Sequence, residues 1–415
     1  MFEKTVLSGG TRFWTEKLPH VRSAAFGIWV GAGSRHEAPR FAGASHALEH
    51  MVFKGTHSRT AAQIAEAMDG MGGQLNAFTT KECTCFYGRA LDNHLTEALD
   101  LVCDIFFNPL LDEADWATER GVIMEEIDMY EDTPEDLVSE RLFSAIFKGS
   151  PLAKPILGNK RSLGKLSAAD LRDYRDSRYG DVTVSLAGMF GDEHINYICE
   201  KFAGVKSSDS AVDAPVAYTP SKVAKRKPIE QNHWCFAFPA LAAGDADRHV
   251  LQVLNGILGG GMSSRLFQAI REKAGLCYEV SSFVAPHRDV GTWGIYMALN
   301  RDAEASALPM VTGILRELAE HGPTDREVDR TREQLKSSAV MGLESTQNRM
   351  NHMGQSDLLV GEVLTVDEMM ERCDAVSRED CRKMAEKLLD FDKMSFSTVG
   401  RVDTVEKYSE LLEDK

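Results

Sequence analysis

The chain has 415 residues, of which 43% are hydrophobic and 27% are charged, a composition typical of a folded globular protein. This length exceeds what one hydrophobic core usually supports, so we expect two or more domains. The formal net charge of −16 argues against nucleic-acid binding, because a phosphate backbone requires clustered Lys and Arg.

Cysteine usage and the N-terminal residues predict the compartment. The eight cysteines are scattered and form no C-x-x-C pair, so the sequence predicts reduced thiols and no cysteine zinc site. Residues 1–10 have no apolar core of a signal peptide, and no apolar stretch approaches the length of a membrane span. We therefore expect a cytoplasmic protein that contacts no membrane.

The first part of the chain alternates between strand and helix patterns. Thr60 is a good N-cap and Gly72 a good C-terminal residue for the helix between them. The apolar patterns predict strands at 4–9, 24–30, 74–80 and 84–91 and helices at 44–54, 61–71 and 92–107.

The predicted helix at 44–54 carries the run His46-Ala-Leu-Glu-His50. Residues four apart lie on one helix face, so the imidazoles of His46 and His50 can bind one transition-metal ion. Glu49 lies beside that face and can take a proton from water without being a ligand. The order H-x-x-E-H is the inverse of the commoner H-E-x-x-H zinc motif. The alternative is a surface helix with these residues by accident, but the preceding strand and glycine turn favour a metal site.

A second helix is predicted from Asp112, its N-cap, to about Tyr130, and it holds the densest cluster of carboxylates downstream of the motif. A zinc site built on two histidines requires a third protein ligand. Glu119 and Glu126 are seven residues apart and share a face, but spacing alone leaves both Glu125 and Glu126 open as the ligand. Most other acids of this helix are expected to be solvated.

The second half repeats the order of the first. Residues 206–231 contain few apolar residues, two prolines in their middle and a basic run, and they predict a linker. Beyond it, a strand at 233–238 and helices at 248–258, 310–320 and 325–340 recur at a spacing of about 210 residues. The sequence predicts an N-terminal domain over 1–205, the linker at 206–231 and a C-terminal domain over 232–415, of which only the first has H-x-x-E-H.

The second half also carries the run Gly259-Gly-Gly261. A phosphate-binding loop would end in G-K-[ST], and this one does not, so a flexible loop before a helix that ends at Gly275 is favoured. Downstream, Arg271 and Tyr278 offer a guanidinium and a phenol, donors that can stabilise an oxyanion or hold a peptide carbonyl.

Four segments together resemble the M16 metallopeptidases, the relatives of pitrilysin, insulin-degrading enzyme and mitochondrial processing peptidase. The run SHALEHMVFKGT at 45–56 is similar to the active-site helix of that family, and ERGVIMEE at 119–126 to its downstream acidic helix. GGQLNAFT at 72–79 is similar to the family's substrate-binding edge segment, and 258–278 to the segment that supplies an Arg and a Tyr. The likeness covers nearly the whole chain and matches the short bacterial processing-protease-like branch.

This resemblance implies an α+β, LuxS-like fold of two tandem similar domains, each a mainly antiparallel sheet packed with helices. It implies a zinc-dependent endopeptidase that hydrolyses extended peptides or unfolded polypeptides inside a closed chamber, as a homodimer because both motif sets lie on one chain. The resemblance implies these roles: one Zn²⁺ per chain held by His46, His50 and Glu126; Glu49 as the base; Glu119 as the carboxylate that supports a histidine ligand; Arg271 and Tyr278 as further catalytic residues; and Asn76, Ala77 and Phe78 as substrate contacts.

Three other interpretations are open from the sequence. The chain could be a noncatalytic scaffold or partner subunit of a peptidase complex, or it could hold a closed structural zinc site with four protein ligands. It could also be a nucleotide-binding protein that uses the run from Gly259 to Gly261. An intact Glu49 speaks against the structural zinc site, because a closed site requires no base.

Overall fold

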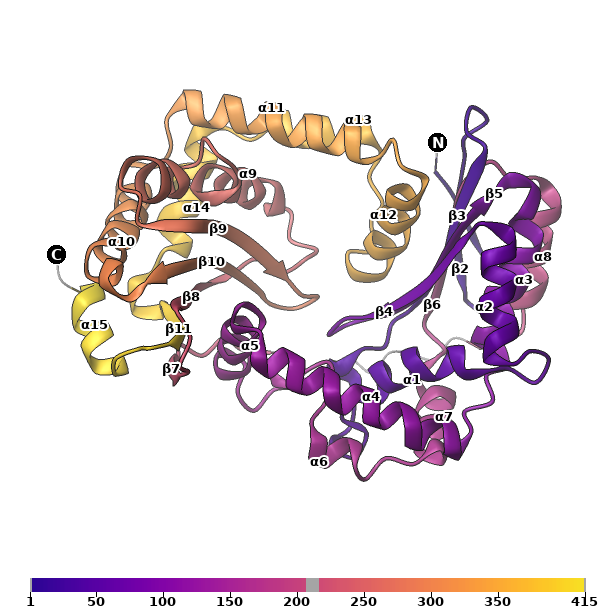
Figure 1. Ribbon diagram of the computed structural model, residues 1–415. Coiled ribbons are helices and arrows are strands. Elements are labelled where there is room, and N and C mark those ends of the chain that lie inside the picture. The colour runs from indigo at the N-terminus through magenta and orange to yellow at the C-terminus, as the bar shows by residue number, and fades with distance from the viewer. Residues whose placement is uncertain (1, 207–215, 414–415) are drawn as a thin grey trace. The chain divides into compact units, whose positions relative to one another are not determined.

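The computed structural model describes residues 2–206 and 216–413, which form two mixed β-sheets, each packed with helices (Figure 1). Each sheet is mainly antiparallel, which confirms the predicted α+β class with two similar domains. All eight cysteines are free.

The first sheet has the strand order β1-β2-β6-β3-β5-β4, and among its described strands β2 and β6 alone pair in parallel. Strand β4 therefore forms one edge of this sheet. The strands are β1 (Glu3–Val6), β2 (Arg12–Lys17), β3 (Ser23–Val30), β4 (Gln74–Thr79), β5 (Thr84–Leu91) and β6 (Val182–Gly188).

The second sheet has the order β7-β11-β8-β10-β9, and its parallel pair is β7 with β11. This order repeats that of the first sheet from β2 onwards, strand for strand in chain order, which supports the predicted internal duplication. The strands are β7 (Lys222–Arg226), β8 (Gln231–Ala240), β9 (Cys277–Pro286), β10 (Gly291–Asn300) and β11 (Ser395–Gly400).

Where capping residues mark the ends of a helix, the helix begins and ends close to the predicted positions. Thr60 Oγ1 accepts the backbone N–H of Gln63, as predicted for the N-cap of α2, and Gly72 ends α2 with a φ of 57°. In the first half the helices are η1 (Ser34–His36), η2 (Pro39–Phe41), α1 (Ala44–Met51), η3 (Val52–Lys54), α2 (Ala61–Met71), η4 (Asp92–His94), α3 (Leu95–Phe107), α4 (Glu113–Asp132), α5 (Pro134–Ile146), η5 (Pro151–Ala153), α6 (Lys160–Leu163), α7 (Ala168–Arg178) and α8 (Asp192–Phe202).

The second half repeats this helix order, with a π-helical segment in place of α2, just before the strand that corresponds to β4. Its helices are α9 (Arg248–Gly259), the π-helical η6 (Phe267–Lys273), η7 (Arg301–Ala303), α10 (Glu304–His321), α11 (Asp325–Gly342), α12 (Thr346–Leu359), α13 (Val366–Asp374), α14 (Arg378–Leu388), η8 (Phe391–Lys393) and α15 (Val405–Glu413). No helix within 2–206 or 216–413 combines the length and the apolarity that crossing a bilayer requires.

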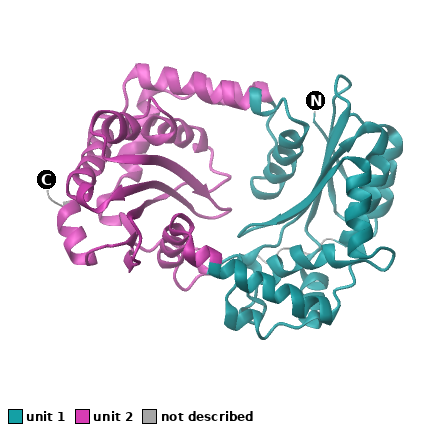
Figure 2. Cartoon of the chain, in the orientation of Figure 1, with its two compact units in different colours: residues 1–128, 154–214, 341–365 teal, residues 129–153, 215–340, 366–415 magenta. Residues whose placement is uncertain are grey.

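Two compact units make up the chain, and they differ from the predicted division at 205 and 232 (Figure 2). Residues 129–153, which carry α5, belong to the unit of the second sheet, and residues 341–365, which carry α12, belong to the unit of the first. The two helices hold equivalent places in the duplicated order, so each half contributes one helix to the other half's sheet. An amphipathic pattern does not reveal which sheet a helix covers, so the sequence could not show this exchange.

The segment predicted as a linker, 206–231, contains a strand in the structure. Residues 207–215 lie outside the described part of the chain, but Lys222–Arg226 forms strand β7 beside β11. Its basic residues are exposed because β7 lies at the edge of the second sheet, where charged side chains are common.

Helix α12 packs closely on one face of the first sheet, opposite the face covered by α3 and α8 (Figure 1). Trp29 is buried under α12 and donates its indole N–H to Ser185 Oγ at 2.9 Å. A methyl group on Gly354 would lie 2.0 Å from Trp29 Nε1, so only glycine permits this approach of helix to sheet. Cys83 and Cys85 lie on this face of the sheet, in the same buried cluster as Trp29.

Asp357 of α12 anchors the helix by charge. Its side chain is 1% exposed and lies 2.5 Å from Arg12 Nε and 2.8 Å from Lys4 Nζ. Thr183 Oγ1 donates a third hydrogen bond at 2.8 Å. Three strands of the first sheet, β1, β2 and β6, are thus tied to one carboxylate from the second half of the chain.

The segment before α1 is held by a buried carboxylate. Glu37 is 2% exposed, and its two oxygens accept the backbone N–H groups of Gly43 and Ser45, each at 2.8 Å. Lys154 donates to the backbone carbonyl of Glu37. The free N–H groups at the start of a helix attract a negative charge, so Glu37 fixes where α1 begins.

Replacing Asp357 by Ala is expected to lower the free energy of unfolding by about 3 kcal/mol, because it leaves the part-buried Arg12 Nε–H and the buried Thr183 hydroxyl without their acceptor. Urea denaturation followed by tryptophan fluorescence measures this change. Asp69→Ala, on the exposed surface of α2, is the control and should change stability little. Equal losses in the two variants would contradict the anchoring role.

Replacing Glu37 by Gln is expected to flatten the pH dependence of stability. Burial raises the pKa of Glu37 to about 7, despite the hydrogen bonds from Ser45 and Gly43. Because this pKa lies above the unfolded value, the stabilisation from Glu37 is full below about pH 4.5 and is lost as pH rises through 7. From pH 5 to pH 8 the wild type should lose about 2 kcal/mol more than Glu37→Gln, as measured by urea denaturation of metal-free protein.

The control for this pH series is Glu66→Gln on the exposed face of α2, which should follow the wild type at every pH. Parallel curves for the wild type and Glu37→Gln would show that the buried carboxyl does not titrate in this range.

Candidate metal centre

Helix α1 presents two imidazoles on one face because its other faces are buried. Its apolar residues pack against α4 and α7, and they are Ala44, Ala47, Leu48 and Met51. His46 and His50 lie one turn apart on the remaining face, with ring centroids 4.6 Å apart. The predicted helical placement of both histidines is therefore observed.

Helix α4 packs against α1 through a row of apolar side chains. Trp116 and Ile123 are fully buried in the cluster that contains α1, and the Trp116 indole donates to the carbonyl of Leu166 at 2.8 Å. At helical spacing, Glu119 and Glu126 follow this row and face α1, whereas Glu125 is exposed. The packing thus separates two neighbouring glutamates that spacing alone left equivalent.

Three side chains converge as a metal-ligand set. Glu126 Oε2 lies 3.6 Å from His46 Nε2 and 3.6 Å from His50 Nε2. One ligand atom from each of the three residues lies within 4.8 Å of the others. Ligand atoms around a tetrahedral zinc ion with bonds of about 2.0–2.1 Å are separated by about 3.3 Å, so the set fits such an ion with little adjustment.

The protonation of the histidines also fits a metal. Burial and the neighbouring His50 lower the pKa of His46 to about 4, so its imidazole is neutral at pH 7, the form that binds metal. Burial raises the pKa of Glu126. A cation at the shared position would compensate for the burial of this carboxylate.

Glu119 supports His50 from α4. Glu119 is buried, with 5% of the residue exposed, and its Oε1 lies 2.8 Å from His50 Nδ1. The imidazole therefore donates its Nδ1–H to Glu119, and its Nε2 faces Glu126. The second oxygen, Oε2, lies 2.5 Å from Lys54 Nζ. Lys54 was not predicted from the sequence, although it follows His50 by four residues, a spacing that indicates a shared side of the helix.

Glu49 lies beside the ligand set without belonging to it. It is half-buried on α1 and interacts electrostatically with both His50 and Glu126. Burial raises the pKa of Glu49, the direction that suits a residue that accepts and returns a proton near neutral pH.

Residues 76–78 lie in β4, at the sheet edge nearest α1. Beyond β4 no described strand follows, so its outer backbone groups are open to an added strand. The N–H of Ala77 donates to the side-chain oxygen of Asn76 at 2.8 Å. Phe78 is half-buried against Trp29 and Tyr87, with ring centroids 5.6 and 5.8 Å away, so it has a packing role.

Arg271 and Tyr278 belong to the unit of the second sheet and contact each other. The Arg271 guanidinium lies 5.1 Å from the centroid of the Tyr278 ring and 4.5 Å from that of Phe267. Tyr278 is 79% exposed. Their role toward the metal ligands stays a prediction.

Two family models match consecutive parts of the chain. Residues 12–160 match the model described as insulinase (peptidase family M16), and residues 165–335 match the model described as the peptidase M16 inactive domain. The first contains H-x-x-E-H and Glu126, and the second contains none of the three ligands.

Named relatives agree over nearly the full length. The uncharacterized zinc protease YmxG of Bacillus subtilis is 39% identical over 94% of this chain and 97% of its own length. An uncharacterized zinc protease of Streptomyces coelicolor is 40% identical over 96% of this chain and 89% of its own.

Solved structures show the same fold at lower identity. A structure described as a peptidase M16 inactive domain from Pseudomonas fluorescens has a TM-score of 0.89 at 20% identity, covering 97% of this chain and 98% of its own. A protease from Helicobacter pylori has a TM-score of 0.89 at 18% identity, covering 96% and 99%.

The matched models cover most of the sequence, and the relatives share more than a third of its residues across almost all of its length. The two repeated sheets and the metal-ligand set agree with this assignment. The chain belongs to the insulinase family of peptidases, peptidase family M16.

Proposed function

We propose that this protein is a zinc-dependent endopeptidase that hydrolyses peptide bonds of extended peptides or unfolded polypeptides. The observation that carries the proposal is the convergence of His46, His50 and Glu126 within 4.8 Å, with Glu49 beside them. The names of the relatives, zinc proteases, support the choice of metal and reaction.

One Zn²⁺ per chain, held by His46, His50 and Glu126, would supply Lewis acidity, which makes water more acidic and polarises a carbonyl group. Three protein ligands leave a fourth position for water or substrate, as a catalytic site requires. A closed structural site would require a fourth protein ligand, and within the described residues the cluster has three.

The chain's own side chains have separate roles in the proposed reaction. Glu49 accepts a proton from the attacking water and returns it to the leaving amine. Glu119 accepts the Nδ1–H of His50 and so fixes the tautomer that presents Nε2 to the metal. In this proposal Arg271 and Tyr278 donate to the substrate carbonyl or to the developing oxyanion.

The substrate is proposed to bind as an added strand at the open edge of β4. Backbone groups of Asn76, Ala77 and Phe78 would pair with an extended peptide, which gives affinity with little sequence preference. Most backbone groups of a folded protein are already paired within it, so the proposed substrates are extended peptides or unfolded polypeptides. A homodimer that encloses the site in a chamber, and a cytoplasmic location, stay predictions.

Purified protein and a peptide library test the proposal against the scaffold alternative. The protein is expected to contain close to one zinc ion per chain by mass spectrometry and to cleave peptides, and a chelator should abolish cleavage until zinc is returned. A metal-free protein that cleaves nothing after zinc is added would favour a noncatalytic subunit. Thermal stabilisation by a nucleotide would instead favour the nucleotide-binding alternative.

Glu49→Gln is expected to keep zinc and lose about 10³-fold or more in kcat, because the amide accepts no proton from water. Steady-state peptide cleavage and metal analysis measure the two quantities on one sample. Glu125→Gln, an exposed glutamate of α4, is the control and should keep its activity. Retained turnover in Glu49→Gln would assign the proton transfer to another group.

Glu126→Ala and Glu125→Ala separate the two glutamates that spacing left equivalent. Glu126→Ala is expected to weaken zinc binding by about 100-fold or more, because loss of a ligand costs more than loss of a supporting residue. Glu125→Ala should bind zinc as the wild type does, since its side chain is exposed. Chelator competition measures both affinities, and the reverse result would assign the ligand to Glu125.

A further inference from the structure

We propose that Lys54 is a positioning residue of the metal site, which holds Glu119 so that one of its oxygens accepts the Nδ1–H of His50. The inference deepens the proposed function and rests on it. It concerns a side chain at the end of η3, one turn beyond His50.

The two oxygens of Glu119 are divided between two donors. Oε2 lies 2.5 Å from Lys54 Nζ, and Oε1 lies 2.8 Å from His50 Nδ1. Rotation of the carboxylate would break both contacts, so Lys54 restricts the orientation in which Glu119 meets the imidazole. A second donor of this kind fixes a supporting carboxylate more firmly than the histidine alone.

Burial makes the partner necessary. The Glu119 side chain is 6% exposed, whereas that of Lys54 is 37% exposed. A buried carboxylate requires a compensating positive charge or several hydrogen bonds, and Lys54, which is itself partly exposed, supplies the charge. Its position four residues after His50 lets both side chains approach Glu119 from the same side of α1 and η3.

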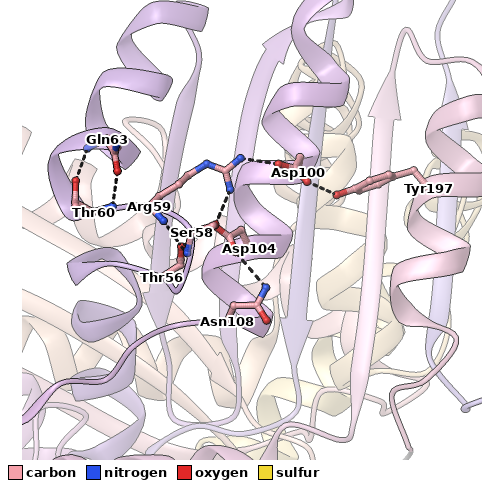
Figure 3. A network of polar contacts seen from close by, with 9 residues as sticks. All are labelled: Thr56, Ser58, Arg59, Thr60, Gln63, Asp100, Asp104, Asn108 and Tyr197. Atoms are coloured by element: carbon pink, nitrogen blue, oxygen red, sulfur yellow. Dashed lines mark hydrogen bonds and ion pairs between the residues drawn. The ribbon is translucent and has the colours of Figure 1, made fainter.

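The chain beyond Lys54 is fixed to α3 by one carboxylate (Figure 3). Asp104 is 8% exposed and accepts hydrogen bonds from Thr56 Oγ1 at 2.7 Å, Ser58 Oγ at 2.6 Å and Arg59 at 2.6 Å. Arg59 also pairs with Asp100 at 2.7 Å. This network limits the movement of the backbone that carries Lys54, so the ammonium group stays within reach of Glu119.

Helix α4 offers a matched ion pair for comparison. Lys160 Nζ lies 2.5 Å from Asp128 Oδ2, the same separation on the same helix. Both of its side chains are about half exposed, at 51% and 50%, and Asp128 contacts neither histidine in the described structure. An exposed pair of this kind contributes little by itself, so any effect specific to Lys54 comes from its action through Glu119.

The test measures the dissociation constant for Zn²⁺ by competition with a chromophoric chelator, in five variants of the full chain. Glu119→Gln is expected to weaken zinc binding about 10–100-fold and Lys54→Met about 10-fold. Because Lys54 acts through Glu119, the double variant should bind no more weakly than Glu119→Gln alone. Lys54→Arg should restore most of the affinity, and Lys160→Met should leave it unchanged.

A spectroscopic readout separates positioning from general stability. In zinc-loaded protein with ¹⁵N-labelled histidine, the Nδ1–H signal of His50 should be protected in the wild type and in Lys54→Arg. In Lys54→Met it should shift and exchange faster with solvent, because the accepting carboxylate is less fixed. Lys54→Gln, which keeps much of the side-chain length, replaces Lys54→Met if the latter does not fold.

Unchanged zinc affinity in Lys54→Met, or in Lys54→Gln where it replaces that variant, would overturn the inference. A double variant whose fold-loss equals the product of the two single fold-losses would overturn it too. The proposed function fails in a different way, since the wild type itself would then bind no zinc or cleave no peptide. A wild type that binds zinc together with unaffected Lys54 variants removes only the role of Lys54.

Discussion

The apolar contact between α1 and α4 is the constraint on which the candidate site depends. Neither helix holds a complete ligand set, because α1 supplies His46 and His50 and α4 supplies Glu126. Buried Trp116 and Ile123 fix the rotation of α4 about its axis, and that rotation decides which of its many acids meets the imidazoles. Side chains that take no part in chemistry therefore determine the geometry that would hold the metal.

Apolar packing between elements also fixes the whole fold, as the exchange of α5 and α12 between the two halves shows. Each sheet buries one face under helices of its own half and the other under a single helix from the opposite half. The contact at Gly354 and the charges around Asp357 show that α12 is fitted closely to the first sheet, although it comes from the second half of the chain. Neither half of the sequence contains all the elements of one compact unit, which ties the two copies of the duplication together.

Much of the site could be predicted from sequence because its signals are local. The spacing of His46 and His50 and the caps of α2 and α4 are properties of one helix turn, and the structure shows each. The choice of Glu126, the contact of Lys54 and the exchange of helices depend on which surfaces meet. Strand β2 was not predicted, because its sequence RFWTEK mixes polar and apolar residues without a strand pattern. It becomes largely buried only in the assembled sheet, where it pairs with β1 on one side and β6 on the other.

The two halves show how a fold and its chemistry separate. Helix α11 occupies the place of α4 in the repeated order, but small residues, Ser338 and Ala339, stand where the first copy has Glu125 and Glu126. The scaffold requires only that apolar residues recur at helical and strand spacing, and many sequences satisfy that requirement. The metal site requires particular side chains at three positions. Likeness to solved structures at 18–20% identity therefore establishes the architecture, and the case for peptidase chemistry rests on the first copy's own histidines and glutamates.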